Sequence, residues 1–187
     1  TYGFPVILLG LLIGLALSFV SEVEVTAPGL DLASRHFLRA GIVLLGLQVT
    51  FAQVGALGWA AFGGLLLVMA GAFAAALVTA RMVGEGREAG VLAGGATAIC
   101  GASAALALYG VIGRERLDQA RFSVTLVGIA VASAIAMLAY PTIARIAGFT
   151  DAQAGFLIGA AVHDAAQAIG GGYSYSDAAG ASTTVVK

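Results

Sequence analysis

The chain has 187 residues, of which 60% are hydrophobic and 10% are charged, and its mean hydropathy is +0.99. A soluble domain carries about 25% charged residues, so nine basic and ten acidic side chains are too few to cover a surface that faces water. The net charge of −1 excludes a basic surface for nucleic acid, and the single cysteine, Cys100, excludes an internal disulfide and a multi-cysteine metal site. We therefore expect an integral membrane protein with the lipid bilayer as its partner, no nucleic acid, no metal and no cofactor.

Uncharged stretches of the chain predict where the membrane segments lie. Residues 3–20 are uncharged and form the first expected span. The uncharged run 40–80 is about twice the ~20 residues that one crossing needs, which predicts two helices, 38–54 and 57–80, with a turn within Phe51–Gly55. The remaining expected segments are 89–113, 122–144, 152–172 and, at 177–187, the start of a further helix.

Two of these segments are interrupted by glycines. We expect an all-α membrane protein, a multi-span helical bundle in which 89–113 and 152–172 are broken or re-entrant. If 89–113 crosses, the arginines divide five to three between the two sides, and if it dips in and returns they divide seven to one. The second division favours a re-entrant hairpin with the arginine-rich side in the cytoplasm, although a crossing stays open. We expect residues 1–187 to form a single membrane domain that is a fragment of a longer transporter.

The first interrupted segment has the composition of a binding site. Gly94–Ser103 holds three glycines, two hydroxyl groups and a thiol, which suit a protein-lined or wet cavity better than lipid. If the helix breaks there, the backbone amides of the next half-helix point into the membrane and can hold an anion. A seam of small residues between packed helices is the alternative interpretation. The candidate substrate-binding residues in this segment are Gly94, Gly95, Thr97, Cys100, Gly101 and Ser103.

The second interrupted segment carries ionisable residues within an apolar stretch. His163 and Gln167 share one face of a helix, and Asp164 is turned about 100° away. Ionisable groups are costly in a membrane and usually functional there, so His163 and Gln167 are candidate substrate-binding residues. His163, Asp164 and Lys187 are candidate coupling residues, because a histidine beside a carboxylate can carry a proton near neutral pH. The alternative is that His163 and Asp164 cap a short helix or lie in interfacial water.

Four stretches together resemble a known family. They are Leu38–Thr50, the core Thr97–Ser103, the segment Val162–Gln167 and the ending Val185–Lys187. Their order and spacing are similar to those of the YeiH-type family of bacterial inner-membrane proteins, which are described as sulfate exporters. This chain has Asp164 where the family usually has glutamate, so its carboxylate is one methylene shorter. The resemblance implies about ten membrane segments, roughly twice this length, and secondary transport of sulfate or an organic sulfonate.

The leading hypothesis is a secondary transporter that moves a small anion, with export as the expected direction, across the bacterial inner membrane as a multi-pass protein. A coupling proton or sodium ion and a homo-oligomer are further partners that this hypothesis allows. No nucleotide-binding P-loop is visible in the sequence. A channel with re-entrant filter segments is one alternative. An intramembrane enzyme, with Ser103 or Cys100 as nucleophile and His163 as base, is the other, although we expect no enzymatic activity.

Overall fold

A computed structural model describes residues 9–10, 13–14, 16–17 and 26–187. These residues are helical or lie in turns and loops, with no strand among them, so the expected all-α class is confirmed. The expected span 3–20 lies largely outside the described residues. The chain divides into two units, Thr1–Ala56 and Leu57–Lys187, which we describe separately.

The described part of the first unit is a helical segment of changing pitch. It comprises α2 (Ala27–Leu32), a π-helical turn η2 (Ala33–Phe37) and α3 (Leu38–Gln48). Val49 is extended and ends α3, and α4 (Phe51–Met82) begins two residues later. The expected turn at Phe51–Gly55 is therefore helical, and the chain bends before it at Val49 and after it at Gly58, whose φ of 70° interrupts α4.

Two long helices form the scaffold of the second unit. The Leu57–Met82 part of α4 and the 28 residues of α7 (Gln119–Ile146) are each long and apolar enough to cross a membrane. They contain the expected segments 57–80 and 122–144. The side chain of Asp118 begins α7 by accepting a hydrogen bond from the Arg121 amide, 2.7 Å away. Such a cap satisfies one of the amides that a helix start leaves without a partner.

The remaining helices are short, and they arise because two apolar segments are each divided in two. The first segment gives α5 (Arg87–Ala98) and α6 (Ala102–Ile112), and the second gives α8 (Asp151–Ala161) and α9 (Ala165–Tyr175), followed by α10 (Asp177–Val186). A helix of 10–12 residues is about 15–18 Å long, roughly half of a hydrocarbon core of about 30 Å. The first division contains Gly101, whereas the second, Val162–Asp164, contains no glycine.

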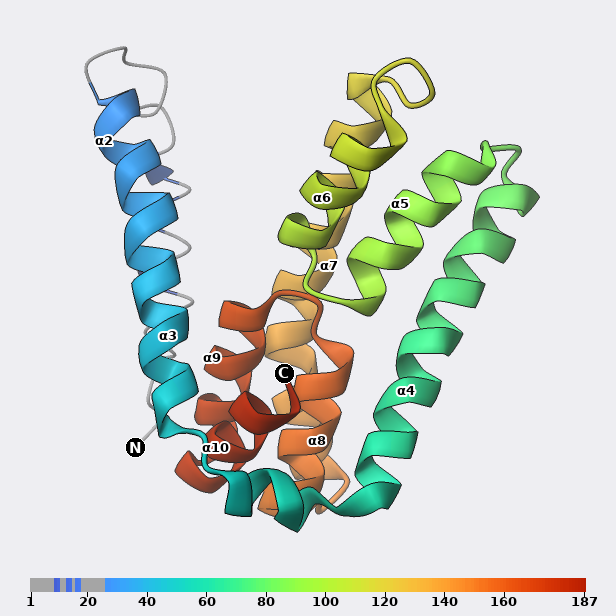
Figure 1. Cartoon of the computed structure of the whole chain (residues 1–187). Coiled ribbons are helices and arrows are strands. Elements are labelled where there is room, and N and C mark those ends of the chain that lie inside the picture. The colour runs from blue at the N-terminus through green and yellow to red at the C-terminus, as the bar shows by residue number, and fades with distance from the viewer. Residues whose placement is uncertain (1–8, 11–12, 15, 18–25) are drawn as a thin grey trace. The chain divides into compact units, whose positions relative to one another are not determined.

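Each divided segment returns to the end from which it started. Arg121 Nε lies 3.1 Å from Glu85 Oε2, so the chain just before α5 and the chain just after α6 are at the same end of the unit. At the other end, Arg145 Nη2 donates to the carbonyl oxygen of Ser174 at 2.6 Å, and Ser176 Oγ donates to Asp151 Oδ1 at 2.5 Å. The pairs α5–α6 and α8–α9 are therefore helical hairpins that approach from opposite ends of α7 (Figure 1). Residues 89–113 therefore run out along α5 and back along α6, and re-entry into the membrane by this hairpin stays a prediction.

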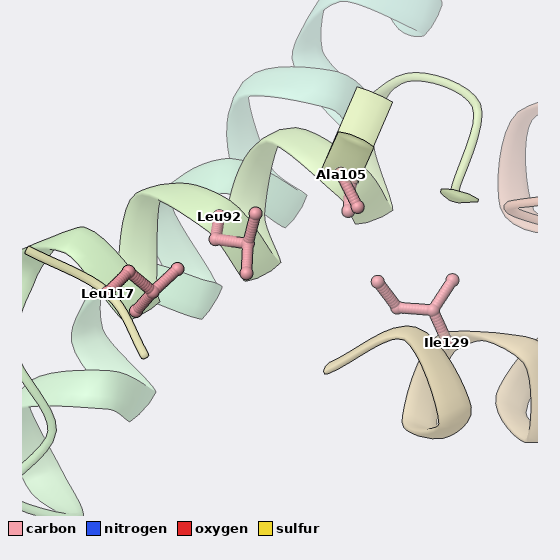
Figure 2. Packing of buried hydrophobic residues seen from close by; sticks show 5 residues of the cluster. Leu92, Ala105, Leu117 and Ile129 are labelled. Atoms are coloured by element: carbon pink, nitrogen blue, oxygen red, sulfur yellow. The ribbon is translucent and has the colours of Figure 1, made fainter. Parts of the chain in front are cut away.

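The first hairpin packs through small residues and one apolar cluster. A methyl group on Gly94 would lie 2.9 Å from Cδ2 of Phe73, so α5 and α4 approach closely because this position has no side chain. The buried cluster joins α5, α6 and α7 and consists of Leu92, Ala96, Ala105, Leu117 and Ile129. Figure 2 shows Ile129 pointing from α7 towards Ala105 of α6. This cluster fixes the hairpin against the long helix.

The second hairpin packs against α10 in the same manner. A methyl group on Gly159 of α8 would lie 2.9 Å from Cβ of Val186 and 3.1 Å from the carbonyl oxygen of Thr183. The buried Thr183 hydroxyl donates to the carbonyl oxygen of Gly155 at 3.1 Å, which joins α10 to α8 by a polar contact. This close packing sets how α10 lies against α8, and hence where Lys187 lies.

Replacing Gly159 with alanine tests whether this close approach stabilises the second hairpin. We expect Gly159→Ala to destabilise the full-length protein by about 1–3 kcal/mol, because the added methyl overpacks the α8–α10 contact. The measurement is the thermal unfolding midpoint in detergent. The control is Gly128→Ala in α7, where nothing lies within 4 Å of the added methyl and helix propensity favours alanine by about 1 kcal/mol. Equal midpoints for Gly159→Ala and the unmodified protein would contradict the packing argument.

Candidate substrate site at the hairpin tips

The tip of the first hairpin is the stretch Ile99–Gly101. Gly101 has φ +65° and ψ −117°, a backbone conformation that side-chain-bearing residues avoid, and it reverses the chain into α6. No side chain caps the N-terminus of α6. Its first two residues, Ala102 and Ser103, are exposed. This helix start therefore presents backbone N–H donors and a partial positive charge without a side-chain acceptor.

The tip of the second hairpin is the stretch Val162–Asp164. Asp164 caps α9, because its Oδ1 accepts a hydrogen bond from the Gln167 amide at 3.0 Å. Its own amide donates to the hydroxyl of Ser133 on α7 at 3.3 Å, which holds the tip against the long helix. The capping role that the sequence offered as an alternative for Asp164 is thus what the geometry shows. The cap also places a carboxylate at the positive end of α9, where the helix dipole favours it.

The two tips meet through a histidine and a lysine. His163 Nδ1 lies 3.0 Å from the carbonyl oxygen of Thr97, and because a carbonyl only accepts, Nδ1 is the donor. Lys187 Nζ donates to the carbonyl oxygen of Val162 at 2.7 Å and to that of Ile99 at 3.3 Å. The carbonyls that α5 and α8 leave unpaired where they end are therefore satisfied by side chains from the second hairpin and α10.

Charged groups and helix dipoles also favour these hydrogen bonds. The ends of α5 and α8 carry partial negative charge on their last carbonyls, which suits the ammonium of Lys187. Asp164 and Cys100 are near enough to interact electrostatically with this ammonium, and His163 is near enough to be repelled by it if protonated. The tips therefore bring together one fixed cation, one carboxylate, one imidazole and one thiol.

The structure places some candidate residues at the hairpin tips and others where helices pack against each other. Gly94 and Gly95 lie in the last turns of α5, where they face Phe73 of α4 and Leu108 of α6, as the small-residue seam would require. The Thr97 hydroxyl donates back to the carbonyl oxygens of its own helix, so only its backbone faces His163. The candidates gathered at the tips are Thr97, Cys100, Gly101, Ser103, His163, Asp164 and Lys187.

Gln167 is buried in the first turn of α9, and its Oε1 has no hydrogen-bond partner among the residues that the structure describes. Such an orphaned acceptor in a protein interior is uncommon. It stays a candidate for binding, and its backbone amide is the one that the Asp164 carboxylate caps. Among the described residues, no group of three or more His, Cys, Asp and Glu side chains could hold a metal ion.

Sequence reasoning missed two kinds of group at this site. The first is the backbone carbonyls of Ile99 and Val162, which no side-chain pattern can reveal. The second is Ser133, fully buried on α7 and bonded to the second tip. Ser133 did carry a signal, because a hydroxyl in an apolar span usually hydrogen-bonds to a neighbouring helix.

The conformation of the first tip depends on glycine at position 101. We expect Gly101→Ala to distort the tip, because the left-handed backbone costs about 1–3 kcal/mol for a residue with a side chain. The measurement is the rate at which a maleimide labels the adjacent Cys100 in a full-length protein that has no other cysteine. We expect this rate to change several-fold. Gly110→Ala, in the same hairpin with open space around the added methyl, should leave the rate unchanged, and equal rates for all three proteins would contradict the assignment.

The comparisons with known proteins agree with the membrane character of the chain. UPF0324 membrane protein CT0845 of Chlorobaculum tepidum is 40% identical over 192 residues, covering all of this chain and 52% of its own length. UPF0324 membrane protein TauZ of Paracoccus denitrificans is 40% identical over 190 residues and is covered to 55%, and a protein of Rhizobium meliloti is 36% identical and covered to 54%. The chain thus spans about half the length of these curated relatives.

No solved structure gives a significant match to the chain. The family model described as "Conserved hypothetical protein 698" matches all of residues 1–187. The resemblance to the YeiH-type family is therefore confirmed. The chain belongs to this family, whose relatives named above are UPF0324 membrane proteins.

Proposed function

We propose that the protein is a secondary transporter that moves a small anion, sulfate or an organic sulfonate, across the bacterial inner membrane. The observation that carries this proposal is the meeting of the two hairpin tips, where Lys187 and His163 bind the carbonyls at the helix breaks. Discontinuous helices that meet within the membrane are how many secondary transporters build their substrate and ion sites.

The order of the helices supports a carrier. A long helix followed by a half-length hairpin occurs twice, as α4–α5–α6 and as α7–α8–α9 (Figure 1). The ion pair between Glu85 and Arg121 places the end of α4 beside the start of α7, so the two copies run in opposite directions. Inverted repeats of this kind support alternating access, in which a site between them opens to each side in turn.

The donors at the tips support an anionic substrate. The uncapped start of α6 offers backbone N–H groups, and the ammonium of Lys187 binds the carbonyl oxygen of Ile99 in the same tip. Sulfate and sulfonate groups are oxyanions, for which a helix N-terminus is a ready binding site. The relative from Paracoccus denitrificans carries a taurine-related name, TauZ, which is in keeping with a sulfonate.

The arginines support one orientation in the membrane. In the second unit, the end that holds the Glu85–Arg121 ion pair has five arginines, and the opposite end has Arg145. Cytoplasmic loops are enriched in basic residues, so the first hairpin enters from the cytoplasm and the second from the other side. The five arginines are Arg81, Arg87, Arg114, Arg116 and Arg121.

A flux measurement tests this function directly. We expect the full-length protein in proteoliposomes to show saturable sulfate flux that responds to an imposed pH gradient. Sulfite, taurine and chloride are the competitors, and one oxyanion or sulfonate should compete far better than chloride. Flux that never saturates would favour the channel. Absence of flux for every anion, with Ser103 or Cys100 required for a chemical activity, would favour the enzyme.

The contribution of His163 to transport can be tested by comparison with a histidine outside the site. We expect His163→Ala to lower the flux about tenfold or more, since losing a hydrogen bond that leaves a buried group unpaired costs about 1–3 kcal/mol. We also expect the pH dependence of the flux to flatten. The control is His36→Ala, because His36 Nδ1 lies 3.2 Å from the carbonyl oxygen of Leu32, one turn earlier in its own helical segment and outside the second unit. Unchanged flux and pH dependence in His163→Ala would remove it from the mechanism.

A further inference from the structure

Lys187 is the only lysine of the chain, and it lies where two helix ends converge. Its Nζ donates to the carbonyl oxygens of Ile99, after α5, and of Val162, after α8. Ile99 is 88 residues away in the sequence and Val162 is 25 residues away. One ammonium therefore joins three helices that belong to different parts of the second unit.

The groups around this ammonium are ligands for a small cation. Carbonyls of unwound segments and the C-terminal ends of half-helices coordinate sodium in secondary transporters. The two carbonyls here come from such segments, and the nearby carboxylate of Asp164 supplies a full negative charge. An ammonium and a sodium ion each carry one positive charge. The oxygen atoms at the tips can therefore bind either an ammonium group or a sodium ion.

We propose that Lys187 is a tethered cation that fills a monovalent-cation site formed by the carbonyl oxygens of Ile99 and Val162, with the negative charge of Asp164 nearby. The ammonium neutralises the two helix ends and holds the hairpin tips together. When Lys187 is absent, the same oxygens accept a sodium ion, with water completing its coordination. A consequence for transport rests on the proposed function. If the protein is a secondary transporter, Lys187 takes the place of a coupling sodium ion, so transport by the unmodified protein does not require sodium.

The experiment removes the ammonium and offers sodium in its place. The thermal unfolding midpoint of full-length Lys187→Ala is measured in sodium chloride and in choline chloride at equal ionic strength. We expect the variant to unfold at a lower temperature than the unmodified protein in choline. We expect 100 mM sodium to raise its midpoint by about 2–4 °C, because a ligand that binds only the folded state stabilises it. The unmodified protein should not respond to the exchange of salts.

Two further variants make the result specific. Arg145 also donates to two backbone carbonyls, those of Ser174 and Tyr175, but at an exposed helix end. Arg145→Ala should lose stability without any response to sodium. Adding Asp164→Asn to Lys187→Ala should abolish the response, because asparagine keeps the cap of α9 but removes the charge.

Each outcome decides the proposal. A sodium response confined to Lys187→Ala and lost with Asp164→Asn supports the tethered cation. A Lys187→Ala midpoint that is the same in sodium and choline overturns it, as does an equal response in the unmodified protein. Because this readout needs no transport, sodium-dependent stability together with an absence of anion flux would refute the proposed function and leave the cation site standing.

Discussion

The arrangement of the second unit depends on satisfying the backbone carbonyls where two helices break. In an apolar environment an unpaired carbonyl costs several kcal/mol, so a helix breaks there only if another group binds its end. The side chain of His163 and the ammonium of Lys187 supply that group for Thr97, Ile99 and Val162. His163 of the second hairpin and Lys187 after α10 therefore satisfy the end of α5, and Lys187 also satisfies the Val162 carbonyl after α8.

Close packing makes this contact geometrically possible. The glycines at 94 and 159 let α5 approach α4 and let α8 approach α10 without intervening side chains. The apolar cluster around Ile129 fixes the first hairpin on α7 (Figure 2). The bond between Ser133 and the Asp164 amide fixes the second. The long helix is thus a common support that holds both tips at one level. Glycine thus has two separate physical roles here, close packing at positions 94 and 159 and chain reversal at Gly101.

The same contact links the fold to the proposed function. Carbonyl ends and a carboxylate attract a cation, whereas the uncapped start of α6 attracts an anion, and the two are joined through Lys187, which bridges the tips. A built-in cation beside a site for a small oxyanion offers a physical route for coupling, because protonation of His163 would place a second positive charge near Lys187. Membership of a membrane-protein family that extends over the whole chain is consistent with such a role.

The sequence by itself determined the membrane class, the positions of the long helices and the two segments around Cys100 and His163, because hydropathy and charge report local composition. It could not decide whether 89–113 crosses or returns, since both arrangements have the same hydropathy. The Glu85–Arg121 ion pair shows that α5 and α6 form a hairpin within the unit, and the bond from Lys187 to Ile99, 88 residues away, joins α10 to its tip. It also could not distinguish glycines that pack, such as Gly94, from Gly101, which reverses the chain. These features depend on contacts between distant residues, and only the tertiary structure sets those contacts.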